Sequence, residues 1–296
     1  MKISQAVEAF KIEQQIRGNS NVTLTNYERV LSYFMSYIGK DTNIAEIGLN
    51  ELRSYYMSLR ARELSTVSIQ TYIRGLRAFL SWCFQEEYIT ENLTDKFKLP
   101  KAKRRVIDVL TDEEITRLFK YFDTSDFIGL RNMCIVLLML DSGLRLSEVV
   151  SLKVSSVHIA EGYIIVTGKG NKERYVPIGL QCKRYLMRYS VYRDSATGEA
   201  PLFVKGTMTA IKINTVKGMF RKLKKCTGIE RLRPHLLRHT FATRYLENGG
   251  DIYSLQMILG HTSLEMVKKY LHLIPSKTVM NFSVYSPVDN ITRKHP

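Results

Sequence analysis

The stretch from Arg233 to Tyr270 constrains this chain more than any other part of it. It reads RPHLLRHTFAT and, after a Gly-Gly turn, LGHTSLEMVKKY. Helical spacing places His235 and Arg238 on one face of a helix, one turn apart, and His261 follows a second, short helix. Arginine neutralises phosphate through a planar fork of donors, histidine moves protons near neutral pH, and tyrosine can act as a covalent nucleophile. The stretch therefore predicts a site for chemistry on a phosphate group.

Positive charge is concentrated in the same half of the chain. The 296 residues carry a formal net charge of +16, with a pI near 9.6. Residues 1–100 hold 12 Lys and Arg against 11 Asp and Glu, whereas residues 101–296 hold 32 against 17. General solubility would explain a basic balance, but so one-sided a surplus favours a polyanionic partner, and nucleic acid in particular.

The cysteines and the apolar segments indicate a soluble protein of a reducing compartment. The N-terminal sequence MKISQAVEAFKIEQQ lacks the apolar core of a signal peptide, and the longest apolar run, residues 133–140, is too short to span a bilayer. No CxxC pair is present, so neither a disulfide framework nor a zinc site is indicated. We therefore expect a cytoplasmic protein without membrane contact. We also expect buried free thiols at Cys83, Cys134, Cys182 and Cys226.

Metal and nucleotide chemistry receive little support from the motifs. His235 and His239 form an HxxxH pair that could bind zinc, but Leu236 stands where an HExxH motif requires glutamate. The GKG sequence at 168–170 is not a P-loop, because GxxxxGK[ST] is missing. We therefore expect no metal, no cofactor and no nucleotide.

Residues 1–99 are predicted to form a helical domain. Apolar side chains at helical spacing indicate four helices, which begin near Ser4, at Thr23 or Thr25, near Asn50 and near Ser65. One face of the fourth helix offers small polar residues followed by arginines, which suits a DNA groove, although an ordinary solvated face explains them equally well. These candidate DNA-binding residues are Ser68, Thr71, Arg74 and Arg77.

A basic linker, residues 100–107, follows this domain. Pro100 discourages helix before it, and four basic side chains crowd the next five positions. Such a segment could follow a phosphate backbone or could simply be solvated. Its candidate DNA-binding residues are Lys101, Lys103, Arg104 and Arg105.

Residues 108–296 are predicted to form a mixed domain around a buried helix at 129–140. A capping box, TDEE, opens it at 111–114. Gly143 allows a tight turn that places Arg145 near the start of a short helix, where backbone donors favour a phosphate. Glu148, three residues on, could brace that arginine or cap the helix.

A β-hairpin and a basic helix are expected in the middle of this domain. β-branched and aromatic runs at 162–166 and 173–178 flank TGKGNK, which predicts a hairpin with Lys169 at its tip. Lys169 could donate a proton to a bound phosphate or serve as a charged turn. Helices are expected at 179–193 and 209–226. The second is a further groove-binding candidate through Lys212, Lys217 and Arg221.

Together these motifs resemble those of the tyrosine recombinases of the Xer and phage or transposon integrase group. The resemblance covers nearly the whole chain. It rests on GLRLSE at 143–148, GKGNKER at 168–174, HLLRHTFAT at 235–243, LGH at 259–261 and Tyr270, in family order and spacing. It implies a mainly α fold with a small β-sheet, in which a helical, SAM-like core-binding domain and a mixed α+β catalytic domain clamp DNA. The catalytic residues it implies are Arg145, Lys169, His235, Arg238, His261 and Tyr270.

The same resemblance implies the reaction and the partners. Tyr270 attacks a DNA phosphodiester to give a 3′-phosphotyrosyl link, and a 5′-hydroxyl from another strand rejoins the DNA without metal or ATP. The implied partner is double-stranded DNA at a specific recombination site, bound by a homotetramer or with a partner recombinase. The chain departs from the family at Pro275, so in place of the family's C-terminal docking helix we expect a shorter element or a strand. His239 is not a catalytic position of the family and is interpreted as structural.

Three biological roles follow from the sequence. The unusual C-terminal tail favours integration or excision of a mobile element. Xer-type resolution of chromosome or plasmid dimers is the alternative. The third alternative is not an enzyme but an architectural DNA-binding protein that has the same fold and has lost catalysis. The presence of all six catalytic residue types counts against this alternative.

Overall fold

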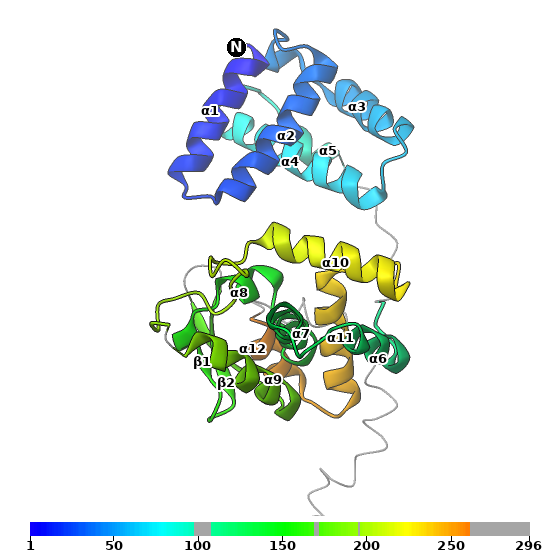
Figure 1. The fold of residues 1–296 in the computed structure, drawn as a ribbon. Helices are drawn as coiled ribbons and strands as arrows, with labels where there is room; N and C mark the ends of the chain where they lie inside the picture. Colours follow the sequence, from blue (N-terminus) through cyan, green and yellow to red (C-terminus); the bar gives the residue numbers. More distant parts are fainter. Residues whose placement is uncertain (98–107, 169–171, 195, 261–296) are drawn as a thin grey trace, which may run out of the picture. The chain divides into compact units, whose positions relative to one another are not determined.

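The computed structural model describes residues 1–97, 108–168, 172–194 and 196–260. The chain divides into two units, Met1–Arg105 and Val106–Pro296, each with its own hydrophobic core. Both units are mainly helical, and the second adds a small antiparallel sheet (Figure 1). This architecture confirms the predicted fold class.

The first unit is a set of helices around an aromatic core. The predicted four helices are confirmed, and the Ser65 hydroxyl caps the fourth by accepting a hydrogen bond from Ser68 N at 3.2 Å. The rings of Phe10 and Phe79, on the first and fourth helices, meet edge to face with centroids 5.5 Å apart. Its elements are α1 (Ile3–Ile16), α2 (Asn21–Ile38), η1 (Ile44–Glu46), α3 (Leu49–Ala61), α4 (Thr66–Gln85) and α5 (Leu93–Lys96).

The second unit carries the helices and strands that position the predicted site. The capping box is confirmed, because Thr111 N donates to Glu114 Oε2 at 2.9 Å and Glu114 N donates to Thr111 Oγ1 at 3.3 Å. The elements before the third strand are α6 (Asp112–Lys120), α7 (Phe127–Asp141), α8 (Leu146–Ser151), η2 (Val154–Ser156), β1 (Val157–His158) and β2 (Tyr163–Thr167). The later ones are β3 (Glu173–Pro177), α9 (Leu180–Ser190), η3 (Val191–Arg193), α10 (Ile213–Thr227), α11 (Pro234–Glu247) and α12 (Ile252–Leu259).

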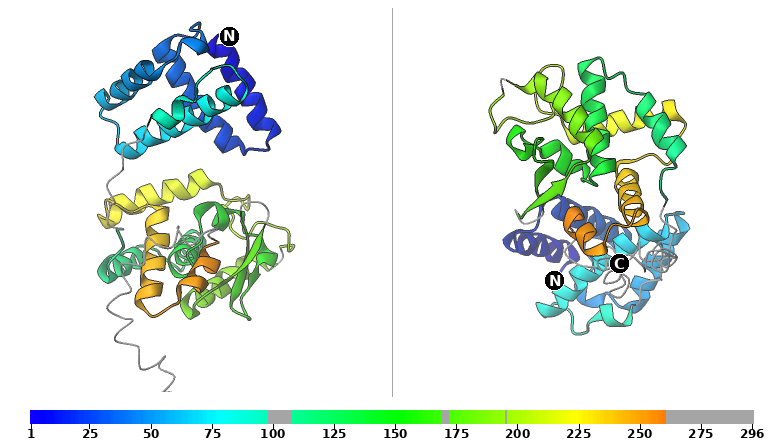
Figure 2. Two further views of the ribbon diagram at one scale, coloured as in Figure 1. Left: turned by 180° about the vertical axis from the view of Figure 1, so that it is seen from behind. Right: turned by 90° about the horizontal axis from the view of Figure 1, so that it is seen from below.

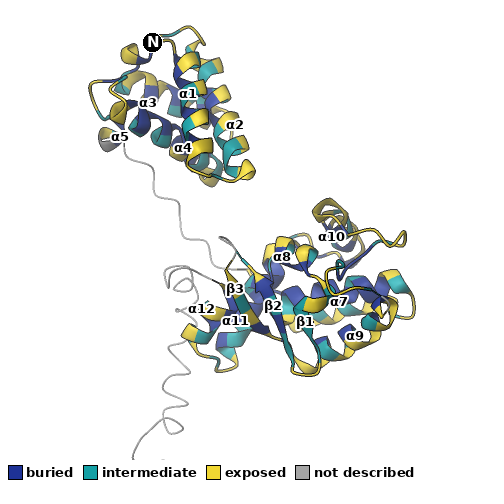
Figure 3. Cartoon of the chain, turned by 90° about the vertical axis from the view of Figure 1, so that its left-hand side faces the viewer, coloured by how far each residue is buried: buried dark blue, intermediate teal, exposed yellow. Residues whose placement is uncertain are grey.

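Helix α7 is the buried centre of this unit, as the sequence predicted. Its N-terminus is capped by Asp126, whose carboxylate accepts from Ile128 N at 2.6 Å and Gly129 N at 3.0 Å. Helices α9 and α11 pack against it (Figure 2). Figure 3 shows that α7 is buried along most of its length, which agrees with its nearly uninterrupted apolar sequence.

The sheet has the strand order β1-β2-β3, with antiparallel neighbours. The predicted hairpin is confirmed, whereas β1 was not predicted because two residues show no periodicity. Ile164, Val166 and Val176 are buried on the inner face of the sheet. Because side chains alternate along a strand, Arg174 on β3 projects to the same inner face as Val176.

A tight turn joins α7 to α8 and sets the start of α8. Gly143 has a φ of +65°, and a Cβ atom built there would lie 2.4 Å from Cδ1 of Phe241. Glycine is therefore required at position 143 for two reasons: its backbone has a positive φ, and α11 approaches too closely for a Cβ atom. The turn makes Arg145 the N-cap residue of α8, as the sequence predicted.

Two expectations about the surface can be checked against the described residues. None of their helices is long and apolar enough to cross a membrane. Cys83, Cys134 and Cys182 are buried, but Cys226 is exposed, so the expectation of a buried thiol is wrong there. Cys226 lies off the buried side of α10, which is formed by Val216, Phe220, Leu223 and Thr227.

We predict that Gly143→Ala lowers the free energy of unfolding by about 2 kcal/mol or more, because it adds both an unfavourable φ and a clash with Phe241. Urea unfolding followed by circular dichroism measures this change. Gly206→Ala is the matched control, since its Cβ atom would meet nothing within 4 Å. Equal stability of the two variants would contradict the packing described for this turn.

Candidate active site

Arg238 lies in the middle of α11 and is 6% exposed. Its Nη1 donates to the Gly143 carbonyl at 2.5 Å, and its Nη2 donates to the Leu259 carbonyl at 2.7 Å. Pro234 occupies the first turn of α11, where its missing N–H costs nothing and its fixed φ suits a helix. The guanidinium group thus joins α11 to the α7–α8 turn and to the end of α12.

Arg145, the N-cap residue of α8, also donates to the Leu259 carbonyl. Its side chain is 32% exposed, and its Nη1 donates to Leu259 O at 3.2 Å and to Glu148 Oε1 at 2.8 Å. In the described part of the chain, Nε and Nη2 of Arg145 have no hydrogen-bond acceptor. The structure therefore brings Arg145 and Arg238 together on one carbonyl. We call this pair of side chains on Leu259 O the guanidinium cage.

The acceptor of the cage is the C-terminal end of α12. Gly260 caps this helix in the left-handed conformation, with a φ of +62°. The last carbonyls of a helix lack partners within the helix and carry the negative end of its dipole. The negative end of the α12 dipole therefore stabilises the two cationic groups that donate to Leu259 O.

Glu148 supports the cage from beneath. It is 6% exposed and accepts hydrogen bonds from Arg145 N at 2.8 Å and from Arg145 Nη1 at 2.8 Å. The structure thus shows both alternatives considered for Glu148, because it caps α8 and braces Arg145. Burial raises the pKa of this carboxyl group, but hydrogen bonds and charge from Arg174 and Arg145 outweigh it, and the pKa lies below its ordinary value.

Arg174 was not singled out from the sequence, although it closes the GKGNKER motif. It donates from Nη1 to Glu148 Oε1 at 3.0 Å and from Nη2 to Glu148 Oε2 at 2.9 Å. The available signal was its place in the hairpin register, two residues before the buried Val176. A charged side chain on the inner face of a strand requires a buried partner.

His235 lies in the first turn of α11, three residues before Arg238, and is exposed to solvent. Partial desolvation, followed by the positive charges of Arg238, Arg145 and Arg233, lowers its pKa below 6.5, the ordinary value for histidine. The imidazole is therefore neutral near pH 7 and can accept a proton. The described members of the predicted catalytic set thus share one neighbourhood.

The other predicted catalytic residues, Lys169, His261 and Tyr270, lie outside the described residues, as do the candidates of the basic linker. In the chain, Lys169 directly follows Gly168, and His261 directly follows the cap residue Gly260. The catalytic roles of all six residues stay a prediction.

Two of the candidate DNA-binding residues of α4 make hydrogen bonds to groups of the same helix or of its N-cap. Ser68 Oγ hydrogen-bonds with Ser65 Oγ at 2.9 Å, and Thr71 Oγ1 donates to Val67 O at 3.0 Å. Arg74 is exposed and Arg77 is half-buried.

The candidates of α10, by contrast, are all exposed. They are Lys212, Lys217 and Arg221, and they lie away from the buried Val216 and Phe220. Of the two predicted DNA-binding helices, α10 therefore presents the clearer basic surface.

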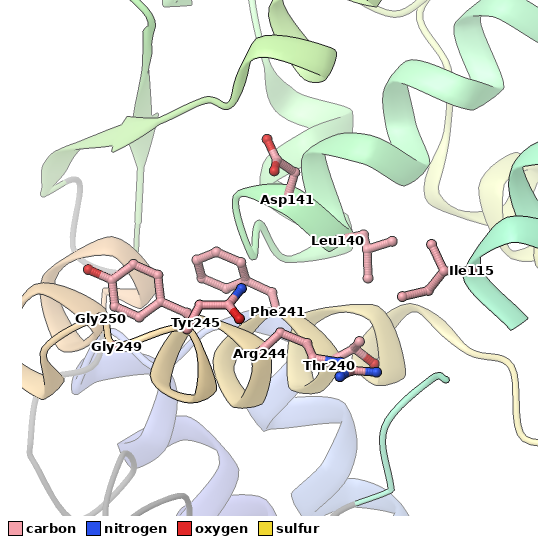
Figure 4. Close-up of a pocket in the computed structure, with 10 residues that line it drawn as sticks. Ile115, Leu140, Asp141, Thr240, Phe241, Arg244, Tyr245, Gly249 and Gly250 are labelled. Atoms are coloured by element: carbon pink, nitrogen blue, oxygen red, sulfur yellow. The ribbon is translucent and has the colours of Figure 1, made fainter. Parts of the chain in front are cut away.

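A pocket of about 530 Å³ lies beside the C-terminal half of α11 (Figure 4). Neither guanidinium group of the cage nor His235 lines it. Its lining residues are Ile115, Leu140, Asp141, Thr240, Phe241, Arg244, Tyr245, Asn248, Gly249 and Gly250. Among the described residues no group of His, Cys, Asp and Glu could hold a metal ion.

Sequence comparisons match both units of the chain. The profile of the Phage integrase family covers residues 108–277, and that of the Phage integrase SAM-like domain covers residues 7–99. Tyrosine recombinase XerD of Oceanobacillus iheyensis is 32% identical over 283 residues, which cover 92% of this chain and 94% of that protein. Tyrosine recombinase XerC of Bacillus pumilus is 30% identical, with 90% of each chain covered.

Solved structures share the fold. The Tn1549 transposon integrase, in complex with circular intermediate DNA, matches with a TM-score of 0.77 at 23% identity, over 91% of this chain and 95% of that one. A lambda integrase dimer bound to a core site matches with a TM-score of 0.76 at 18% identity, over the same shares. Fold and sequence thus define a DNA strand-exchange enzyme of the tyrosine type. The chain belongs to the phage integrase family and is a tyrosine-type site-specific recombinase.

We predict that Glu148→Gln lowers the free energy of unfolding by about 3 kcal/mol at pH 7, because it leaves two arginines without their buried counter-charge. The folded pKa of Glu148 is depressed, so its contribution is complete above pH 4.5, its ordinary pKa, and is lost as pH falls through the folded pKa. The gap between wild type and variant should therefore narrow below pH 4.5.

Urea unfolding at pH 7 and at a series of lower pH values measures the gap. The control is Glu161→Gln, an exposed glutamate, which should change little at any pH. A gap that stays constant on acidification would show that the carboxylate charge of Glu148 is not what holds the two arginines.

Proposed function

We propose that this recombinase cleaves and rejoins DNA through a 3′-phosphotyrosyl intermediate formed on Tyr270. The observation that carries the proposal is the guanidinium cage, in which Arg145 and Arg238 converge on one carbonyl beside a neutral, exposed histidine. Fixed cationic donors at one point are the arrangement that a phosphate in its transition state requires.

The two arginines act on the non-bridging oxygens of the scissile phosphate. Negative charge builds on these oxygens as the phosphorus becomes five-coordinate, and charge-assisted hydrogen bonds from guanidinium groups stabilise it. Arg145 has Nε and Nη2 available for this contact, whereas Glu148 and Leu259 O hold its Nη1. These cations supply the charge that a metal ion supplies in other phosphoryl-transfer enzymes.

Four further residues supply the nucleophile, move protons or hold an oxygen atom of the phosphate. The phenol oxygen of Tyr270 forms a bond to phosphorus as the bond from phosphorus to the 5′-oxygen breaks, and His235 accepts the phenol proton. Lys169 protonates the leaving 5′-oxygen, and His261 donates a hydrogen bond to a non-bridging oxygen. The reverse attack by a 5′-hydroxyl releases Tyr270 and rejoins the DNA, so no ATP is consumed.

Double-stranded DNA is the proposed partner, and α10 is the proposed contact surface of the catalytic unit. Its exposed Lys212, Lys217 and Arg221 can bind phosphates along a groove. We further propose a tetramer on DNA, since exchange between two duplexes requires four cleavages. A lambda integrase tetramer bound to a Holliday junction matches this chain with a TM-score of 0.73.

For the biological role, the relatives favour Xer-type recombination over integration of a mobile element. The XerD and XerC relatives named above match over 92% and 90% of the chain, at 32% and 30% identity. The likeness to the transposon integrase is one of fold, and the tail that suggested a mobile element lies outside the described residues. Terminal repeats and mobile cargo beside the gene would reverse this preference.

We predict that wild-type protein forms a denaturant-resistant covalent adduct with DNA and that Tyr270→Phe forms none. The probe is a library of nicked duplexes with a randomised centre, in which release of a short strand traps the intermediate. The matched control is Tyr253→Phe, because Tyr253 is an exposed phenol on α12 and should leave adduct formation unchanged.

Adducts are separated by electrophoresis under denaturing conditions and their DNA is sequenced, which also identifies the target site. EDTA should not reduce the yield. If Tyr270→Phe still formed adducts, another nucleophile would carry the reaction.

We predict that the cleavage rate falls as the pH decreases through the pKa of His235, because the protonated imidazole cannot accept the phenol proton. This fall should occur below pH 6.5, since the pKa of His235 is lowered from that value. Single-turnover cleavage of a selected duplex between pH 5 and 8 measures the profile. In His235→Gln the acid limb should disappear and the rate should fall by about 100-fold. An unchanged limb in that variant would assign the titration to a different group.

A further inference from the structure

Every nitrogen of the Arg174 guanidinium group is used inside the protein. Two of them hold Glu148, and Nε donates to the Ile258 carbonyl at 2.8 Å. The side chain is 13% exposed. Arg174 therefore lies next to the cage without being placed to bind DNA, unlike Arg145.

The two acceptors of Arg174 are the groups on which the cage depends. Glu148 braces Arg145, and the Ile258 carbonyl precedes Leu259 O at the end of α12. A Cβ atom on Gly260 would lie 3.0 Å from Nε of Arg174. Arg174 thus packs against the end of α12, and the glycine there is required for this contact as well as for its φ.

The charges around Glu148 explain why a second arginine is needed. Glu148 and Arg145 alone would form a neutral ion pair, with Arg145 held by the carboxylate and not by a phosphate. Because Arg174 takes both oxygens of Glu148, the guanidinium group of Arg145 contacts only one of them, through Nη1, while the other accepts from the main-chain N–H of Arg145. The three groups together keep one net positive charge.

Lysine could not replace this arginine. A single ammonium nitrogen cannot meet both carboxylate oxygens and a main-chain carbonyl on the far side, whereas the planar fork of arginine can. The contacts of Arg174 thus use the full geometry of its side chain.

We propose that Arg174 is a positioning residue for DNA cleavage: it occupies Glu148 and the end of α12, so that Arg145 stays in place and remains free to attract phosphate. The proposal rests on the proposed function above. It separates Arg174 from an ordinary structural ion pair, because such a pair would affect folding and not the charge that Arg145 presents.

Suppression in a double variant tests the proposal. Arg174→Met leaves Glu148 to neutralise Arg145, and we expect single-turnover cleavage of a library-selected duplex, at saturating protein, to slow about 100-fold. Adding Glu148→Gln removes the competing carboxylate. The double variant should then cleave about tenfold faster than Arg174→Met alone, whereas a structural role predicts an equal or slower rate.

Arg231 provides a matched control. It also holds a glutamate with two nitrogens, at 2.6 and 2.7 Å from Glu114, and donates to the Val109 carbonyl at 2.9 Å. None of these groups touches the cage. Arg231→Met should cleave within about twofold of wild type, and adding Glu114→Gln should not increase its rate.

Arg174→Lys is a second, milder variant, which tests the proposal even if Arg174→Met does not fold. It keeps the charge and loses the fork, so its rate should fall between those of wild type and Arg174→Met. If wild type forms no adduct with any duplex, the proposed function fails. If wild type cleaves and Arg174→Met cleaves equally fast, or the double variant shows no gain, only the role of Arg174 fails.

Discussion

The carbonyl of Leu259 is the point on which the site depends. Guanidinium groups from α8 and α11 both donate to it, at 3.2 and 2.7 Å. Two like charges repel each other, so they stay together only where an acceptor offsets the repulsion. The C-terminal end of α12 is such an acceptor, because its last carbonyls lack partners within the helix. A main-chain atom, which no side-chain substitution removes, is therefore the acceptor that the two arginines share.

The same point links parts of the chain that are far apart in sequence. The turn after α7, the hairpin strand β3, and helices α11 and α12 all contribute a group to the cage or to its support. Glycines at 143 and 260, both with positive φ, allow these close approaches. The geometry of the proposed site is thus a property of several elements of the second unit and not of one motif.

Sequence patterns predicted the elements well where they rested on spacing or capping. The capping box of α6, the buried α7 and the place of Arg145 at the start of α8 followed from local rules. The role of Leu259 O could not be predicted, because a carbonyl acceptor carries no signature in the sequence. Arg174 was missed for a related reason, since its partner Glu148 is distant in the chain.

The burial of the Glu148–Arg174 pair has a consequence for how the protein responds to ionic strength. Salt weakens interactions between exposed charges strongly and those between buried charges much less. The contacts proposed between the exposed basic residues of α10 and a phosphate backbone belong to the first kind, because such contacts release counterions. The ion pair beneath the cage belongs to the second kind. We therefore expect added salt to weaken DNA binding at lower concentrations than those that disturb the proposed catalytic arrangement, so a salt titration separates the two effects.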